Sequence, residues 1–155
     1  MAIVFDRDFG RVWSDGATPY IFSSIVFVPQ PEELNELVEK QLGLIRELKR
    51  KYGEVYSILD LRLCPQLPAP IIQHYIDHIV PLQFKAGLKH KALVATHEKK
   101  SFEVLAHAFI SIANLPLSIH YTFENALDKL NQKHALAKAE VRPKSFFSLF
   151  SNLVR

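Results

Sequence analysis

Hydrophobic residues along the first 28 positions fall in short runs that turn-forming residues separate. Residues 2–5 and 11–13 are two such runs, and residues 20–28 form a third that is rich in β-branched and aromatic side chains. Asp, Gly and Ser lie between the runs, and prolines follow the third. This pattern predicts three short strands joined by turns, which would form an antiparallel meander at one edge of a sheet.

A helical period begins at Pro31 and continues to residue 52. Apolar residues recur every three to four positions, and Gln41 interrupts this stripe. Glutamates gather at the start of the segment and lysines and arginines at its end, which complements the helix dipole. Pro31 suits a first turn, and Gly53 suits a helix end. The basic cluster near residue 50 is therefore explained without a ligand.

Beyond this helix, strand-like runs alternate with helical patterns. Strands are predicted at residues 55–61, 91–96 and 117–121, and helices at residues 69–83, 101–113 and from Thr122 onward. Such alternation with short links favours a parallel sheet joined by right-handed crossovers. We predict an α/β fold for residues 1–135, with a mixed, mostly parallel sheet of four to five strands. An N-terminal antiparallel meander and about four helices, mainly on one face, complete it.

The last twenty residues differ from the rest of the chain. Residues 136–144 have the composition of a basic linker, and the stretch that follows is amphipathic. Its apolar stripe comprises Phe146, Phe147, Leu149, Phe150, Leu153 and Val154. A helix with this stripe is expected to dock on its own domain, a second copy of the chain, a protein partner or a membrane surface.

Composition limits the class of protein. Of 155 residues, 48% are hydrophobic and 23% charged, which favours a globular domain over disorder. The only cysteine, Cys64, cannot form an internal disulfide, and no signal peptide or membrane-spanning run is apparent, so we expect a cytoplasmic protein. The net charge of +3 is spread along the chain, which argues against a nucleic-acid partner.

Four segments carry a family resemblance through their order and spacing. They are residues 56–62 (YSILDLR), 79–89 (IVPLQFKAGLK), 92–95 (ALVA) and 121–130 (YTFENALDKL). Together they resemble the SpoIIAA-like, STAS/SEC14-type family of small bacterial proteins. The resemblance implies a STAS-like fold and a binding or regulatory module, since relatives of the wider fold bind anti-sigma kinases, nucleotides or lipids. Residues 62–70 carry no hydroxyl group, so phosphorylation of the family's usual loop is not expected.

Ligands of open α/β sheets gather at the carboxyl ends of the strands. The candidate ligand-binding residues at this rim are Asp60, Arg62, Cys64, Leu67, Ile71, Phe84, Leu88 and His97. The apolar members predict a cleft for an apolar or lipid-like ligand, although ordinary core packing explains them equally well. The alternative is a small enzyme that uses Asp60 and Cys64, but the sequence assembles no catalytic motif around them.

Metal and nucleotide cofactors are not predicted. His74 and His78 have a spacing that can hold a metal, but no further ligands are identifiable. No glycine-rich phosphate loop follows any predicted strand. The sequence therefore predicts a non-enzymatic binding or regulatory module, with a protein partner, a homodimer mate or a small apolar ligand.

Overall fold

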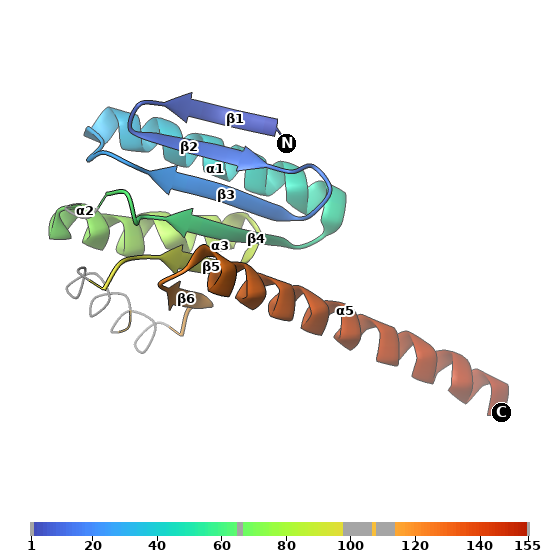
Figure 1. The fold of residues 1–155 in the computed structure, drawn as a ribbon. Helices are drawn as coiled ribbons and strands as arrows, with labels where there is room; N and C mark the ends of the chain where they lie inside the picture. The colour runs from blue at the N-terminus through green and yellow to red at the C-terminus, as the bar shows by residue number, and fades with distance from the viewer. Residues whose placement is uncertain (1, 65–66, 98–106, 108–113, 155) are drawn as a thin grey trace.

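A computed structural model describes the backbone of residues 2–64, 67–97, 107 and 114–154, and the side chains of these residues as far as residue 139. Six strands form one mixed sheet in the order β1-β2-β3-β4-β5-β6 (Figure 1). They are β1 (Ala2–Arg7), β2 (Gly10–Ser14), β3 (Tyr20–Ile25), β4 (Val55–Asp60), β5 (Leu88–Val94) and β6 (Leu117–His120). The prediction of four to five strands is wrong, because the whole meander hydrogen-bonds into the same sheet as the parallel strands.

The direction of the strands follows the prediction. β1, β2 and β3 pair antiparallel, whereas β3 with β4, β4 with β5, and β5 with β6 pair parallel. Strand order in the sheet is the same as order in the chain, so successive crossovers step in one direction. Right-handed crossovers of this kind place their helices on a single face. The α/β class and the mostly parallel sheet with an antiparallel meander are confirmed.

Helix α1 (Pro31–Tyr52) forms where its period predicts it. A capping box holds its start, in which the backbone N–H of Gln30 donates to the Glu33 carboxylate at 2.9 Å. Gly53 ends it with φ of 81°, and its N–H donates to the Lys49 carbonyl. The buried face of α1 packs against the sheet and includes Gln41.

The second helical segment contains a π-helical turn. It comprises α2 (Ala69–His74), the π-helix η1 (Tyr75–Ile79) and α3 (Val80–Ala86), without a break between them. Gly87, with φ of 129°, ends the segment three residues beyond the predicted end. α1 and this segment share one hydrophobic core on one face of the sheet.

The opposite face is covered by α5 (Phe123–Val154), whose Ala126 and Leu130 are buried against β4 and β5. α5 continues past the edge of the sheet (Figure 1). It is one helix through the segment predicted as a linker. Residues 135–140 (ALAKAE) are strong helix formers, and the helix continues through Pro143.

The described residues therefore form three helical segments, whereas about four helices were predicted. The helix expected at residues 101–113 lies outside the described residues, apart from His107. None of the helices in the described part of the chain has the length and apolarity needed to cross a membrane.

Candidate functional site

Asp60 and Arg62 form a closed ion pair at the carboxyl end of β4. The Asp60 carboxylate accepts from Arg62 Nη2 at 2.8 Å, from Nε at 3.0 Å and from the backbone N–H of Arg62 at 3.0 Å. The hydrogen bonds to Asp60 raise the pKa of the Arg62 guanidinium. A carboxylate held by three donors of one neighbour is poorly placed to act as a general acid or base.

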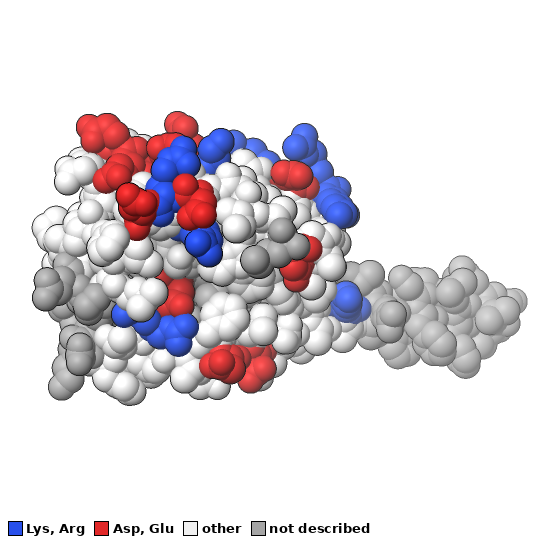
Figure 2. Space-filling model, turned by 45° about the horizontal axis from the view of Figure 1, so that its top comes forward, with Lys and Arg blue, Asp and Glu red and all other residues white. Residues whose placement is uncertain are grey.

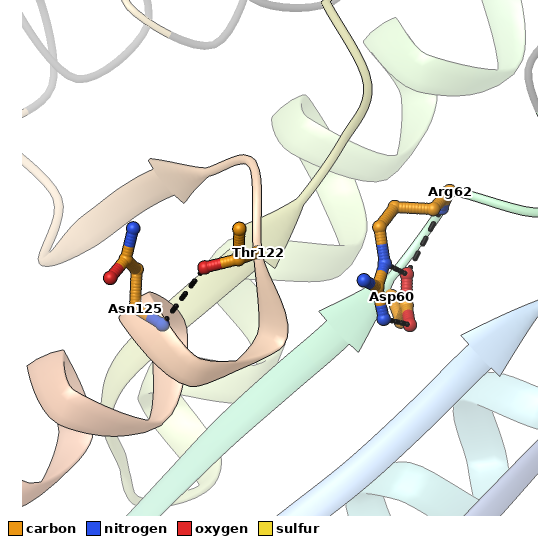
Figure 3. Close-up of polar contacts among 4 residues, drawn as sticks. All are labelled: Asp60, Arg62, Thr122 and Asn125. Atoms are coloured by element: carbon orange, nitrogen blue, oxygen red, sulfur yellow. Dashed lines mark hydrogen bonds and ion pairs between the residues drawn. The ribbon is translucent and has the colours of Figure 1, made fainter.

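This pair lies beside the start of α5 (Figure 3). There the Thr122 hydroxyl accepts from the backbone N–H of Asn125 at 3.1 Å and so caps the helix. The charge of Glu124 contributes to the raised pKa of Arg62. The hydrogen bonds at this corner are local, since Asp60 holds the residue two positions later and Thr122 caps the start of α5, and both have a structural role.

The other polar members of the predicted rim have different surroundings. His97 is exposed, and its ring stacks on Tyr121 with 3.9 Å between centroids. Cys64 is buried in the core on the α1 face, where its N–H donates to the Leu61 carbonyl at 3.1 Å. His97 therefore stacks on Tyr121, and Asp60 pairs with Arg62. These contacts do not bring His97 and Asp60 together around Cys64.

An apolar cavity of about 10 Å³ lies between α1, α2 and the carboxyl half of the sheet. Its lining comprises Ile25, Leu34, Leu59, Leu61, Leu67, Ile71, Ile72, Tyr75 and Leu93. Two predicted ligand-binding residues, Leu67 and Ile71, are among them. A cavity of this size has room for about one water, and its apolar lining would leave that water without partners.

An open cleft of about 390 Å³ lies directly outside this cavity. Pro29, Pro31, Asn35, Pro70 and His74 line it together with Leu34 and Ile71, which also line the cavity. The side chains of Leu34 and Ile71 therefore separate the two spaces. The volume of the cleft falls within the range of about 300–1,000 Å³ that is usual for small-molecule sites.

Phe84 and Leu88 do not belong to this cleft, and their placement corrects the prediction. Leu88 starts β5 and pairs with Val55, the first residue of β4, whereas Asp60 pairs with Val94 at the other end of both strands. The segment from α2 to α3 runs back along the sheet, so Phe84 near its end lies at the amino edge. Residues at the two ends of a crossover helix in a parallel sheet cannot share one rim.

A buried polar network lies deeper on the same face, and the sequence analysis missed it. Gln41 Nε2 donates to the Ser23 hydroxyl at 3.0 Å, and Gln41 Oε1 accepts from Gln83 Nε2 at 2.8 Å. Gln83 Oε1 accepts from Lys91 Nζ at 2.9 Å, and the Ser57 hydroxyl lies 3.3 Å from the same nitrogen. The sequence could have indicated this network, because its polar residues stand at positions where the apolar pattern predicts burial. Gln41, which interrupts the apolar stripe of residues 31–52, is the example that the sequence analysis noted.

Two histidines share one hydroxyl on the α5 face of the sheet. Ser118 Oγ lies 2.8 Å from His90 Nε2 and 2.8 Å from His120 Nε2. Burial is the main cause that lowers the pKa of His90, to about 4, and Lys133, Lys129 and His120 lower it further. Burial and Lys129 likewise lower the pKa of His120. The lowered pKa values favour the neutral form of both imidazoles, and in that form one ring can donate to Ser118 while the other accepts from it.

Tyrosines and a third histidine continue this face toward the amino edge. Tyr20 donates to Asn131 on α5 at 2.6 Å, and Tyr56 donates to Glu54 at 2.6 Å. The ring of His134 lies 5.5 Å from that of Tyr56 and 6.0 Å from that of Tyr20. Burial raises the pKa of both tyrosines and lowers that of His134. α5 thus covers a layer of neutral polar rings.

The same face continues onto β1 and β2, beyond the contacts that Tyr20 and Phe22 of β3 make with α5. Ile3 is 48% exposed there, and the partly buried Trp13 and Phe22 stack with 5.7 Å between centroids. Figure 2 shows that Lys, Arg, Asp and Glu side chains of both signs gather on one part of the surface. Arg7 forms an ion pair with Glu36, and Arg11 forms one with Asp6. The docking residues predicted between 146 and 154 lie on the distal part of α5, where only the backbone is described.

His74 and His78, whose spacing could suit a metal, have no further metal ligands near them among the described residues. The rings of His74 and His78 lie 5.1 Å apart on α2 and η1. Within the described ranges, no group of three or more His, Cys, Asp or Glu side chains is arranged to hold a metal ion. The pair therefore has no third protein ligand among these residues.

Comparisons with protein-family models, with curated proteins and with solved structures give no match to this chain. The resemblance to the SpoIIAA-like family therefore stays a prediction, and function must be inferred from the geometry of the site.

Proposed function

We propose that this chain is a non-enzymatic binding module of STAS-like type that takes a small apolar ligand between α1 and α2. The observation that carries the proposal is the open cleft of about 390 Å³, which shares Leu34 and Ile71, among the residues that the structure describes, with the small apolar cavity at the carboxyl half of the sheet. Binding there would bury apolar surface of the ligand, which is worth about 25 cal/mol per Å². The SpoIIAA-like resemblance supports a binding role independently.

Ile71 is the residue whose movement would admit a ligand. Its side chain is half-buried and lies on α2, a helix of six residues. A change of rotamer at Ile71 would join the cavity to the cleft without disturbing the sheet. Leu34 is held more firmly, because it is 6% exposed on the long helix α1.

The alternative, a small enzyme that uses Asp60 and Cys64, has weaker support. Three hydrogen bonds from Arg62 occupy the Asp60 carboxylate. The Cys64 thiol is 3% exposed within the hydrophobic core. A thiol enclosed in the core is poorly placed to reach a substrate.

The neutral dye Nile red tests the proposal with the full chain. We expect saturable binding of one dye per chain, detected by its fluorescence. Ile71→Trp should fill the space between cavity and cleft and weaken binding at least tenfold. Leu82→Trp is the matched control, since Leu82 is 50% exposed on α3 and does not line the cavity. Equal binding by Ile71→Trp and the unmodified protein would overturn the proposal.

A further inference from the structure

Lys91 is a fully buried amine in the middle of β5. Its exposed fraction is 0%, and its Nζ contacts only neutral groups in the described network, namely Gln83 Oε1, the Ser57 hydroxyl and the ring of Tyr75 at 5.4 Å. Among the residues that the structure describes, no carboxylate forms an ion pair with it. A buried charge is normally paired, because neutral hydrogen bonds only partly replace its hydration.

This amine lies next to the inner end of the apolar cavity. Leu93, which lines the cavity, follows Lys91 by two positions on the same face of β5, a step of about 7 Å along a strand. The paired strand repeats the arrangement, since Ser57 pairs with Lys91 and Leu59 with Leu93. The floor of the site thus changes from apolar to polar within one step along both strands.

Tyr75 lies at this boundary and contacts both the apolar cavity and the polar network. Its ring lines the cavity and lies over Lys91 Nζ, while its hydroxyl is 3.3 Å from Gln41 Oε1 and 3.4 Å from Gln83 Nε2. A movement of this one side chain would connect the cavity with the buried amine. Tyr75 is also the first residue of the π-helix η1.

The π-turn explains why Tyr75 and Gln83 meet. Residues eight apart in a regular α-helix are separated by roughly 80° around the axis. The residue that a π-turn inserts absorbs about 100° of that rotation, so the two side chains come to within roughly 20°. Both side chains then face the sheet and contact the network around Lys91. Turns of this kind are frequent at functional sites.

From these relationships we infer that the apolar ligand is a monocarboxylic acid, such as a long-chain fatty acid, whose carboxylate pairs with Lys91. This inference rests on the proposed function and specifies its ligand class. The hydrocarbon chain occupies the cleft of about 390 Å³. Movement of Ile71 and Tyr75 opens the narrow cavity, so that the carboxylate reaches Lys91 Nζ with the hydroxyls of Ser57 and Tyr75 as further donors. One buried cation with neutral donors matches a single negative charge, whereas a phosphate dianion would remain undercompensated.

The test compares cis-parinaric acid with its methyl ester on the full chain, using the fluorescence of the polyene. The two probes share a hydrocarbon chain and differ in charge. We expect the acid to bind at least tenfold more tightly than the ester, and Ile71→Trp to weaken both. Equal affinity for acid and ester would overturn the carboxylate inference and leave the apolar site standing. Failure of both probes to bind would overturn the proposed function itself.

Substitution of Lys91 tests whether this residue causes the preference for the acid over the ester. Lys91→Gln keeps a hydrogen-bond donor for Gln83 and Ser57 but removes the charge, so the acid should lose at least tenfold in affinity and the ester should not. Lys89→Gln, an exposed lysine on the same strand, is the matched control and should change neither. Circular dichroism establishes that each variant is folded. If Lys91→Gln does not fold, the acid–ester comparison on the unmodified protein remains decisive.

Discussion

Gln41 and Gln83, which lie 42 positions apart in the chain, are joined by a buried hydrogen bond of 2.8 Å between Oε1 of Gln41 and Nε2 of Gln83. Both side chains are almost completely buried, with exposed fractions of 1% and 0%. The bond links α1 to α3 across the face of the sheet. Polar groups in such a position stabilise a fold only while each has its partner.

Removal of Gln41 should therefore be costly. Gln41→Leu fills a similar volume but leaves Ser23 and Gln83 without the groups that they contact in the folded protein. We expect the free energy of unfolding to fall by about 2 kcal/mol or more, as measured by urea denaturation. Gln132→Leu, at an exposed position of α5, is the control and should change it by about 0.5 kcal/mol or less. Equal effects of the two substitutions would contradict the role given to the network.

The lowered pKa of His90 should make stability depend on pH. The folded protein holds this pKa at about 4, below the ordinary 6.5, so the unfolded chain binds the proton more readily. Stability from this group is fully present above pH 6.5 and is lost as the pH falls toward 4. The loss should approach about 3 kcal/mol.

Urea denaturation between pH 8 and pH 4 measures this dependence. His90→Gln should flatten the profile between pH 6.5 and pH 4, whereas His97→Gln, at an exposed site, should leave it unchanged. Lys129, Lys133 and His120 face the same ring and contribute to its lowered pKa. An unchanged slope in His90→Gln would show that other groups carry the acid sensitivity.

Two glycine-to-alanine substitutions should have opposite effects. A Cβ at Gly10 would lie 2.6 Å from the carbonyl oxygen of Ser24, so Gly10→Ala must displace backbone between β2 and β3. At Gly43, inside α1, a Cβ would meet nothing within 4 Å. We expect Gly43→Ala to raise the melting temperature, consistent with a gain of about 0.5–1 kcal/mol, and Gly10→Ala to lower it. A Gly10→Ala variant that melts at or above the temperature of the unmodified protein would contradict the register of β2 with β3.

The distal part of α5 should dock on a second molecule, which is either another protein chain or a membrane surface. Its backbone continues past the sheet, so the apolar stripe predicted for residues 146–154 cannot rest on the domain that precedes it (Figure 1). Deletion of residues 144–155 should therefore change the oligomeric state seen by sedimentation, or abolish liposome binding, with little change in melting temperature. A truncated protein that sediments as before, with liposome binding absent in both forms, would show that this segment does not dock.

Sequence patterns predicted the elements of this fold better than the contacts between them. The 3.6-residue period fixed α1 within its observed ends, because the burial of one helix face is a local property. The π-turn at Tyr75 gave no separate signal, since the apolar pattern of residues 69–86 is compatible with an uninterrupted helix. The composition after residue 135 indicated a linker, whereas the backbone of α5 runs through these residues and past Pro143, which helix propensity does not predict.

The structure divides the predicted ligand-binding residues between two edges of the sheet. Leu67 and Ile71 do line the apolar cavity, but Phe84 and Leu88 lie at the other edge of the sheet. The sequence shows that these residues are near one helix and does not by itself show which end of the helix meets which rim. The sharing of Ser118 by His90 and His120 depends on the pairing of β5 with β6, which hydrophobic patterns leave open.

His90 and Lys91 are neighbours in the chain but point to opposite faces of β5, one toward Ser118 and the other toward Gln83. A slip of β5 by one residue would exchange them. It would bring a lysine beneath α5, near Lys129 and Lys133, and leave an imidazole facing the glutamine side chains. A shift by one residue therefore separates charges and hydrogen-bonding groups from their complements. The alternation of these two residues opposes every alignment of β5 that exchanges its faces.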